Sequence, residues 1–530
     1  MARMGPPDSD DREARRRDST LPRAYNGVVL TRRQFGARLA PAFIRSRSAP
    51  RPPNLLFLIS DDHAAYVMGC DGNPQALTPN LDRLAREGVR FSSHYCNSPV
   101  CTPSRQSLFT GQMPHAAGVT VLETPLDPSK PTLAKQLKKA GYTTAAIGKM
   151  HFNRPPSPGL HGLDHPLTDG AATRAWQQQV KPAPVDSSIP VQELPWRPFR
   201  TPARQWLNAA AAPYPRFDAD MRGTFLVRQA ARFLEENRSR PFALWLSLFE
   251  PHSPFDFPVE DRGLFDPLQF LPPQAAADDE WQIPRIFRDL TVRDRQGIIA
   301  ACYSSVHFLD RNWGRILDKL RQLRLDENTL VVCTADHGCC LGHHGRFEKH
   351  CGYEPALRVP LIVRWPGRIE PGVVTDLTEH IDLGPALLEM LGAPPFQLQH
   401  GRSLAPYLRG RRPEKPRDCI VSQYLENEEI YVRTPKWKFM YCSGRRRRLD
   451  GYETDHPAPG RYVRLFNLEK DPGEFRNLAP DHPSVVRELQ RTALGRLRAT
   501  HPEAAAEPSS ASLEDALDFY LRPRDARTQA

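Results

Sequence analysis

The sequence predicts an α/β protein with a large doubly wound sheet, mixed or mostly parallel and flanked by helices, followed by a smaller C-terminal α+β domain with an antiparallel sheet. Three observations support this prediction. Four short apolar segments end in polar or ionisable residues, segments with helical periodicity lie between them, and the character of the chain changes near residue 410.

The four apolar segments have the length and composition of strands that are buried on both faces, as in parallel sheets. Ligands of such sheets bind beyond the carboxyl ends of the strands. The polar residues that end the segments are therefore the first candidates for a functional site. The segments are NLLFLISDDH (54–63), YTTAAIGKMH (142–151), FALWLSLFEPH (242–252) and TLVVCTADHG (329–338).

Helices are expected between these strands. Residues 306–323 repeat apolar side chains every three or four positions, which is typical of an amphipathic helix. In TPNLDRLAREG (78–88), Thr78 is a candidate N-cap, Pro79 lies in the first turn and Gly88 marks the end. TLAKQLKKAGY (132–142) precedes the second strand in the same way.

The chain is long enough for several units. Residues 1–50 are an Arg-rich leader that we expect to be disordered, and LTRRQFGARLAPAFIRSRSAP (30–50) within it resembles a twin-arginine export signal, so export and a cytoplasmic location both stay open. The large domain spans 51–410. A smaller domain spans 411–502, with antiparallel strands in 429–442 and 461–479 and a helix from Pro483 to about Leu497, and 503–530 is a low-complexity tail with one short helix at 513–521.

Composition excludes several classes of protein. The net charge is +11, and most of this excess lies in the first 51 residues, which carry twelve Arg against five acidic residues. A dispersed basic tail of this kind is more often solvating than nucleic-acid binding, so we expect no nucleic-acid partner. The run Arg445–Arg448 is predicted at a hairpin tip, although contact with an anionic substrate or surface stays open. No apolar run approaches about 18 residues, so no transmembrane segment is expected. The ten cysteines form no C-x-x-C pair and are expected to be mostly buried thiols.

The stretch NSPVCTPSRQSLFTG (97–111) predicts an anion pocket that contains a sulfur side chain. Thr102 is a predicted N-cap and Pro103 the first helical residue, so Cys101 lies at a helix entrance that favours anions. Arg105 is one turn further along the helix. A plain thiolate is one interpretation, but cysteine phosphatases place five residues between Cys and Arg in a Gly-containing loop, whereas three intervene here.

Cys101-Thr102-Pro103-Ser104-Arg105, followed by Thr110-Gly111, resembles the signature of the type I, formylglycine-dependent sulfatases of the alkaline phosphatase-like superfamily. The similarity covers roughly 54–479 and includes GKMH, the DHG loop and LFNLEKDPGEFRNLA. It implies that 51–410 is the catalytic domain of a sulfuric ester hydrolase. It also implies that a separate maturation enzyme oxidises Cys101 to Cα-formylglycine, whose hydrated aldehyde attacks sulfur with one hydroxyl and releases sulfate through the other.

The resemblance also implies a metal site. One divalent metal would bind beside the residue 101 oxygen, held by Asp61, Asp62, Asp336 and His337. Oxygen-rich ligation favours Ca²⁺, with Mg²⁺ as an alternative. Several sulfatases have Asn at the position of His337, and the softer imidazole makes Mn²⁺ more plausible here.

The remaining site residues are carried over in the same way. Lys149 and Lys349 would bind sulfate oxygens, and Arg105 would contribute to the anion pocket. His151 would hold the diol and take its proton, while His252 is a candidate general acid for the departing alcohol. Four further histidines are expected to be structural or pocket-lining, without assigned roles: His115, His343, His344 and His350.

Three other functions stay open. A phosphonate monoester or phosphodiester hydrolase would have the same fold, and both kinds of ester present a single negative charge. A second class is a non-catalytic binding protein on this fold, although the sequence argues against it because every expected polar position is filled. A third class is polyanion binding by the basic tails. For the leading prediction, the substrate is a small-molecule or carbohydrate sulfate ester. The sequence does not indicate an oligomeric state.

Overall fold

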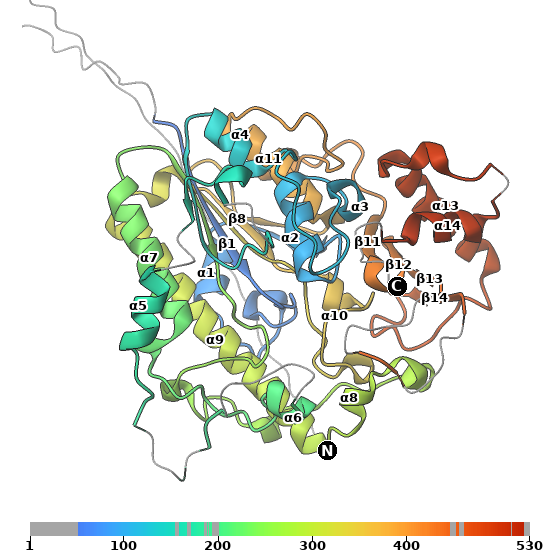
Figure 1. The fold of residues 1–530 in the computed structure, drawn as a ribbon, viewed down its shortest axis with the longest axis horizontal. Coiled ribbons are helices and arrows are strands. Elements are labelled where there is room, and N and C mark those ends of the chain that lie inside the picture. Colours follow the sequence, from blue (N-terminus) through green and yellow to red (C-terminus); the bar gives the residue numbers. More distant parts are fainter. Residues whose placement is uncertain are drawn as a thin grey trace, which may run out of the picture. The chain divides into compact units, whose positions relative to one another are not determined.

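The central sheet confirms the predicted α/β class. The structure, a computed structural model, describes residues 51–523 except 154–157, 167–170, 185–187, 189, 193–200, 446–451, 455–459 and 510. Within these residues a mixed sheet of eight strands has the order β5-β4-β6-β1-β7-β8-β2-β9 (Figure 1). The predicted leader 1–50 and most of the basic run 445–448 lie outside the described residues.

All four predicted strands form, and they are neighbours in the middle of the sheet. β4 pairs with β6, β6 with β1, and β1 with β7, always in parallel. Because parallel strands end at the same edge, the polar residues that follow them are brought together. The four strands are β1 (Asn54–Ser60), β4 (Thr143–Gly148), β6 (Phe242–Ser247) and β7 (Thr329–Ala335).

The rest of the sheet makes it mixed. β8 is antiparallel to both β7 and β2, while β9 is parallel to β2 and β5 is parallel to β4. A separate pair joins β3 to β10. These strands are β2 (Val89–Phe91), β3 (His94–Tyr95), β5 (His165–Pro166), β8 (Leu361–Arg364), β9 (Gly372–Val374) and β10 (Thr378–Glu379).

Helices cover both faces of the sheet, which confirms the doubly wound arrangement (Figure 1). On one face lie α2 (Cys101–Thr110), α4 (Leu133–Lys139) and α11 (Leu383–Leu391). On the other lie α1 (Pro79–Arg86), α7 (Arg222–Asn237) and α9 (Val292–Gln322). The other helices of this region are α3 (Pro114–Ala117), α5 (Ala171–Gln179), α6 (Ala203–Trp206), α8 (Arg285–Arg288), α10 (Glu354–Leu357) and α12 (Ala405–Leu408).

α9 is longer than the helix predicted at 306–323. It begins at Val292, where Thr291 and Asp294 form a capping box: Asp294 N donates to Thr291 Oγ1 at 3.1 Å, and Thr291 N donates to Asp294 Oδ2 at 2.9 Å. The helix continues through Gly297. Glycine is needed at this position because the backbone of Ala209 lies where a Cβ would stand. Helices at the predicted positions 78–88 and 132–142 are confirmed as α1 and α4.

The C-terminal region contains an antiparallel sheet of four strands and two helices. The sheet order is β11-β12-β13-β14, and α14 packs against α13 beside it, burying Leu517 and Tyr520. The packing therefore continues past residue 502, so the predicted tail contributes to the C-terminal core. The elements are β11 (Ile420–Tyr424), β12 (Glu429–Arg433), β13 (Trp437–Cys442), β14 (Tyr462–Asn467), α13 (Pro483–Thr500) and α14 (Leu513–Leu521).

Two further observations concern membrane segments and cysteines. Among the described residues, no helix has both the length and the apolarity needed to cross a membrane. All ten cysteines are free thiols, and only Cys70 and Cys419 are not fully buried.

Candidate active site

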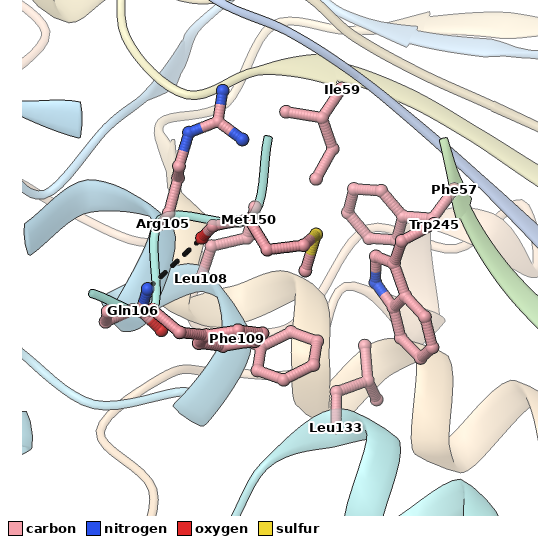
Figure 2. Close-up of a pocket in the computed structure, with 10 residues that line it drawn as sticks. Phe57, Ile59, Arg105, Gln106, Leu108, Phe109, Leu133, Met150 and Trp245 are labelled. Carbon is pink, nitrogen blue, oxygen red and sulfur yellow. Dashed lines mark hydrogen bonds between the residues drawn. The ribbon is translucent and has the colours of Figure 1, made fainter. Parts of the chain in front are cut away.

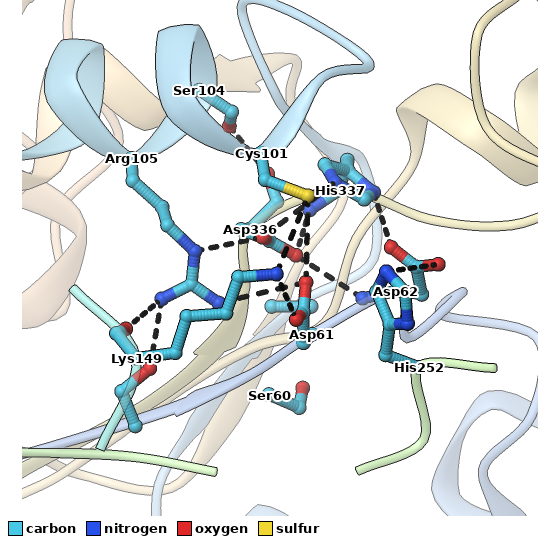
Figure 3. Close-up of polar contacts among 12 residues, drawn as sticks. Ser60, Asp61, Asp62, Cys101, Ser104, Arg105, Lys149, His252, Asp336 and His337 are labelled. Atoms are coloured by element: carbon cyan, nitrogen blue, oxygen red, sulfur yellow. Dashed lines mark hydrogen bonds and ion pairs between the residues drawn. The ribbon is translucent and has the colours of Figure 1, made fainter. Parts of the chain in front are cut away.

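The predicted site residues meet at the carboxyl edge of the sheet (Figure 3). Asp61 and Asp62 directly follow β1, and the DHG loop directly follows β7. Opposite these strand ends, α2 points its first residue, Cys101, into the cluster. Lys149 follows β4, and His252 lies in the loop after β6.

α2 begins two residues earlier than predicted. Its first helical hydrogen bond runs from Ser104 N to Val100 O at 3.0 Å, so Val100 is the N-cap and Cys101 the first helical residue. The Thr102 hydroxyl does not cap the helix, because it donates to Leu122 O at 2.7 Å. The prediction of Thr102 as N-cap was wrong, but Cys101 still lies in the first turn, where free amides favour anions.

Cys101 is surrounded by cationic groups. Its Sγ lies 3.2 Å from His337 Nε2, 3.4 Å from Lys349 Nζ and 3.6 Å from Lys149 Nζ. Burial raises the pKa of the thiol, but the two ammonium groups together outweigh burial and the net pKa lies well below its usual value. The position therefore favours negative charge on the group at residue 101.

A compact set of metal-type ligands lies beside this sulfur. Ligand atoms of Asp61, Asp62, Cys101 and His337 all lie within 4.8 Å of one another, and all four residues are buried. Burial opposes ionisation of Asp61, but Lys149 and then His252 hold the pKa of this carboxyl well below its ordinary value. Two carboxylates and an imidazole form a donor set that fits a divalent cation.

Two lysines pair with these carboxylates. Lys149 Nζ donates to Asp61, and Lys349 Nζ donates to Asp62 Oδ1 at 2.6 Å. Lys349 is only 7% exposed, so it is a buried group rather than a solvated loop lysine. Each ammonium thus contacts both a carboxylate and the group at residue 101.

Asp336 lies next to this cluster but outside the compact ligand set. Its Oδ1 accepts from the amides of Asp62 at 3.1 Å and His337 at 2.9 Å, and its Oδ2 accepts from Arg105 Nε at 2.8 Å. Burial raises the pKa of Asp336 to about 7, although Arg105 opposes the shift. The side chain joins the ends of β1 and β7, a role that the sequence did not predict.

Arg105 also differs from its prediction. The guanidinium is buried at the base of the site, with Nη2 3.7 Å from Asp61 Oδ1, and it does not line the open pocket. Its Nη1 donates to Ser247 Oγ at 2.8 Å and to Lys149 O, so it connects α2 with the ends of β4 and β6. Ser247 was missed by sequence analysis; its only signal is a hydroxyl at the end of the apolar β6 segment.

The two predicted proton-transfer histidines both line the pocket. His252 Nδ1 donates to Ser253 O at 2.7 Å, which leaves Nε2 to face Asp62 Oδ2 at 3.8 Å. Burial lowers the pKa of His252, and Asp62 opposes this shift. His151 has a left-handed backbone with φ 59°, and its Nδ1 is buried without a described partner.

The pocket above Cys101 has a volume of about 670 Å³ and contains Lys149, Lys349 and both histidines. Its wall comes from loops and from the end of the short helix α6, which carry no periodic signal, so the sequence did not indicate these residues. They include four aromatic and three acidic side chains: Trp206, Phe255, Phe347, Tyr452, Glu123, Glu426 and Glu453.

The additional histidines behave as expected. His115 bonds Gln423 Oε1 and Thr500 Oγ1, both at 2.8 Å, and is structural. His344 stacks on Tyr353 and bonds Asp279, while His350 lines the pocket.

A buried anionic position between metal-type ligands and lysines, at the carboxyl edge of a doubly wound sheet, is the arrangement of a hydrolase that acts on ester anions. The family model "Sulfatase" matches residues 53–393, and that of the "N-sulphoglucosamine sulphohydrolase, C-terminal" region matches 342–500. The chain therefore belongs to the sulfatase family and is a sulfuric ester hydrolase.

Similar proteins agree with this assignment. The chain is 28% identical to a choline-sulfatase of Rhizobium meliloti, covering 85% of this chain and 86% of that one. It is 29% identical to human arylsulfatase A, covering 84% and 87%. Among solved structures, the phosphonate monoester hydrolase of Agrobacterium radiobacter has a TM-score of 0.69 at 22% identity, covering 87% of this chain and 98% of that one, which shows a shared fold.

Proposed function

We propose that this sulfatase cleaves sulfate monoesters with residue 101 as the nucleophile, after a maturation enzyme has oxidised Cys101 to formylglycine. The observation that supports this most is the position of the Cys101 Sγ, between two lysines and the metal-type ligands at the base of the pocket. An oxygen nucleophile at this position would face the sulfur of an ester held by the lysines. The substrate is a small-molecule or carbohydrate sulfate ester.

Asp61, Asp62 and His337 would hold one divalent metal, with Asp336 as a further candidate ligand. The bound cation would acidify the hydrated aldehyde and neutralise charge on the sulfate. Oxygen ligands favour Ca²⁺, and Mg²⁺ is the alternative with the same preference. The imidazole of His337 makes Mn²⁺ a third candidate.

The protein's own groups then have separate tasks. Lys149 and Lys349 bind sulfate oxygens, and their existing contacts with carboxylates fix where the ammonium groups stand. Arg105 holds Asp336 and the Lys149 backbone in place from below. His252 Nε2 delivers a proton to the departing alcohol, and His151 takes a proton from the group at residue 101.

Phosphonate monoester or phosphodiester hydrolysis is a second candidate activity. His337, in place of the Asn found in several sulfatases, is the observation that favours it. A phosphodiester carries the same single negative charge as a sulfate monoester, so the two lysines could hold either.

A substrate comparison tests the proposal. Enzyme produced with a maturation enzyme is assayed on nitrophenyl sulfate, choline sulfate and sugar sulfates, and in parallel on an aryl phosphonate ester. We expect higher kcat/KM on the sulfates, and loss of turnover in Cys101→Ala. A higher kcat/KM on the phosphonate would favour the second candidate, and full activity of Cys101→Ala would overturn the proposal.

We also propose that 51–410 is the catalytic domain, and that 411–502 together with α14 forms an α+β subdomain attached to it. Export by the leader and a cytoplasmic location both remain compatible with this function. Expression of the chain from residue 51 should therefore preserve turnover.

A further inference from the structure

The segment that carries Lys149 and His151 has no regular secondary structure. β4 ends at Gly148, and residues 149–153 are neither helix nor strand. Buried backbone carbonyl groups are nearly always hydrogen-bonded. Residues 149–151 are half-buried and form no regular ladder, so their carbonyl groups depend in part on partners from another part of the chain.

Two consecutive side chains of α2 provide these partners. Arg105 Nη1 donates to Lys149 O. Gln106 Nε2 donates to Met150 O at 3.3 Å and to His151 O at 2.9 Å, and Figure 2 shows the first of these bonds. Gln106 is fully buried, so bulk water does not compete for its amide group. Three successive carbonyl groups of the segment are thus bound to one helix.

The backbone at His151 needs such support. Its φ of 59° lies in the left-handed region, which a residue with a Cβ adopts at a cost in free energy. A conformation of this kind persists only where the surroundings impose it. The bond from Gln106 to the His151 carbonyl is a direct constraint on that residue.

A small cavity lies beside Gln106 and Met150, in the space between α2 and the sheet. The cavity has a volume of about 10 Å³, and the Met150 side chain extends into the space between α2 and the sheet (Figure 2). Apart from Arg105 and Gln106, its lining is apolar: Phe57, Ile59, Leu108, Phe109, Leu133, Met150, Phe152 and Trp245. These side chains offer no other hydrogen-bond donor to the carbonyl groups, except the indole of Trp245.

We propose that Gln106 is a positioning residue for the reaction, and that its two hydrogen bonds set where His151 stands relative to residue 101. Cys101 and Gln106 belong to the same helix, so one rigid element places both the nucleophile and the segment that carries its proton acceptor. The inference rests on the proposed roles of Lys149 and His151. Gln106 itself touches neither substrate nor metal.

Gln106→Leu removes both bonds and keeps a side chain of similar volume. We expect kcat to fall by about 10- to 100-fold, because a misplacement of 1 Å can cost about 10²-fold. KM should change much less, since Lys349 is untouched and Arg105 still binds Lys149 O. The loss should be alike for nitrophenyl and alkyl sulfates, because His151 acts after the alcohol has left.

Gln112→Leu is the matched control. Gln112 is also buried and donates Nε2 to a backbone carbonyl, Leu398 O at 3.2 Å, and its Oε1 likewise has no described partner. It should lower thermal stability to a similar extent as Gln106→Leu and leave kcat within about twofold of wild type. Equal losses of kcat in both variants would overturn the inference, because they would indicate a general packing defect.

Gln106→Glu adds a readout in pH. A carboxylate cannot donate to either carbonyl group, whereas the protonated acid can donate its one O–H to one of them, and burial raises the pKa of such a carboxyl. The ratio of variant to wild-type kcat should therefore rise as the pH is lowered from about 8 to 5. A ratio that does not change with pH would contradict the role of Gln106 as a donor. Absence of sulfatase turnover in the wild-type enzyme would instead overturn the proposed function.

Discussion

At the scale of single residues, the site is a set of opposed buried charges around residue 101. Asp61 and Asp62 each pair with one lysine, and both lysines reach the Cys101 sulfur. Removing one partner of such a pair would leave the other charge buried and unpaired, which is costly. Substitutions that keep the shape of a side chain are therefore the informative ones here.

Replacing His252 by Ala should affect poor leaving groups most. A nitrophenolate departs without much protonation, whereas an alkyl alcohol needs a proton from His252. General acid assistance contributes about 10²- to 10⁴-fold, so the loss on alkyl sulfates should exceed that on nitrophenyl sulfate by up to this factor. Steady-state kinetics on both esters measures it, with His307→Ala on α9 as a control.

The pH dependence should change in the same variant. Burial lowers the pKa of His252 below its ordinary value of 6.5, and Asp62 only partly opposes this. The protonated imidazole is thus lost as the pH rises through that lowered pKa, and kcat/KM on alkyl sulfates should fall with it. His252→Ala should abolish this dependence. Equal losses on good and poor leaving groups would refute the general-acid role.

Asp61→Asn and Asp62→Asn should each weaken metal binding while nearly preserving side-chain volume. Loss of an outer partner of a metal ligand costs about 10- to 100-fold in affinity, and loss of a direct ligand should cost more. Calorimetric titration of chelated enzyme with Ca²⁺, Mg²⁺ and Mn²⁺ measures this. The control is Asp310→Asn, because Asp310 is a buried carboxylate that accepts hydrogen bonds from backbone amides of α1.

His337→Asn should shift the preference of the metal site toward Ca²⁺, because an amide oxygen replaces an imidazole nitrogen. An unchanged order of metal affinities would show that His337 is not a ligand. Full turnover after complete removal of metal would contradict the whole metal assignment.

At the scale of secondary-structure elements, the site depends on where strands stop. β4 ends at Gly148, whose φ is 98°, and a Cβ there would lie 1.7 Å from Ser247 O on β6. Only glycine allows β4 to approach β6 so closely at the point where the chain turns toward Lys149.

Gly148→Ala should therefore destabilise the protein by at least about 2 kcal/mol, because overpacking adds to the unfavourable φ. Gly141→Ala is the matched control: it has a φ of 84° but no atom within 4 Å of the added Cβ. It should cost only about 1 kcal/mol. Urea unfolding measures both, and equal effects would show that the contact with Ser247 is not important.

At the scale of the whole molecule, buried ion pairs join the C-terminal sheet to the catalytic region. Lys438 on β13 is completely buried and donates to Glu354 Oε1 at 2.6 Å, and Arg433 lies 3.5 Å from the same carboxylate. Burial opposes ionisation of Glu354, but Lys438 and then Arg433 lower its pKa to about 2. The C-terminal sheet and the catalytic region should therefore unfold together.

Lys438→Ala should destabilise the protein by about 3–5 kcal/mol, because it leaves Glu354 buried beside fewer cations. Arg232→Ala breaks an exposed pair with Glu236 within one helix and should have little effect on stability, because solvent screens such a pair. Denaturant unfolding of both variants measures the difference. Comparable small losses of stability in both variants would show that the interface does not depend on the Lys438–Glu354 pair.

Much of this architecture could be predicted from the sequence, because buried parallel strands leave a continuous apolar signal. All four predicted strands form, and the structure brings together Asp61, Lys149, His252 and His337 at their polar ends. The start of α2 was misplaced, because a tertiary contact takes the Thr102 hydroxyl. The inward role of Arg105, the pocket wall and Gln106 depend on contacts between distant segments, which local pattern does not encode.

The central claim is that residue 101 acts as an oxidised cysteine, and peptide mass spectrometry of active enzyme tests it most directly. Preparations made with increasing amounts of maturation enzyme should contain an increasing fraction of aldehyde at residue 101. Specific activity should rise in proportion to that fraction and extrapolate to zero where only Cys101 thiol is present. Full sulfatase activity in a preparation whose residue 101 is entirely thiol would contradict the account.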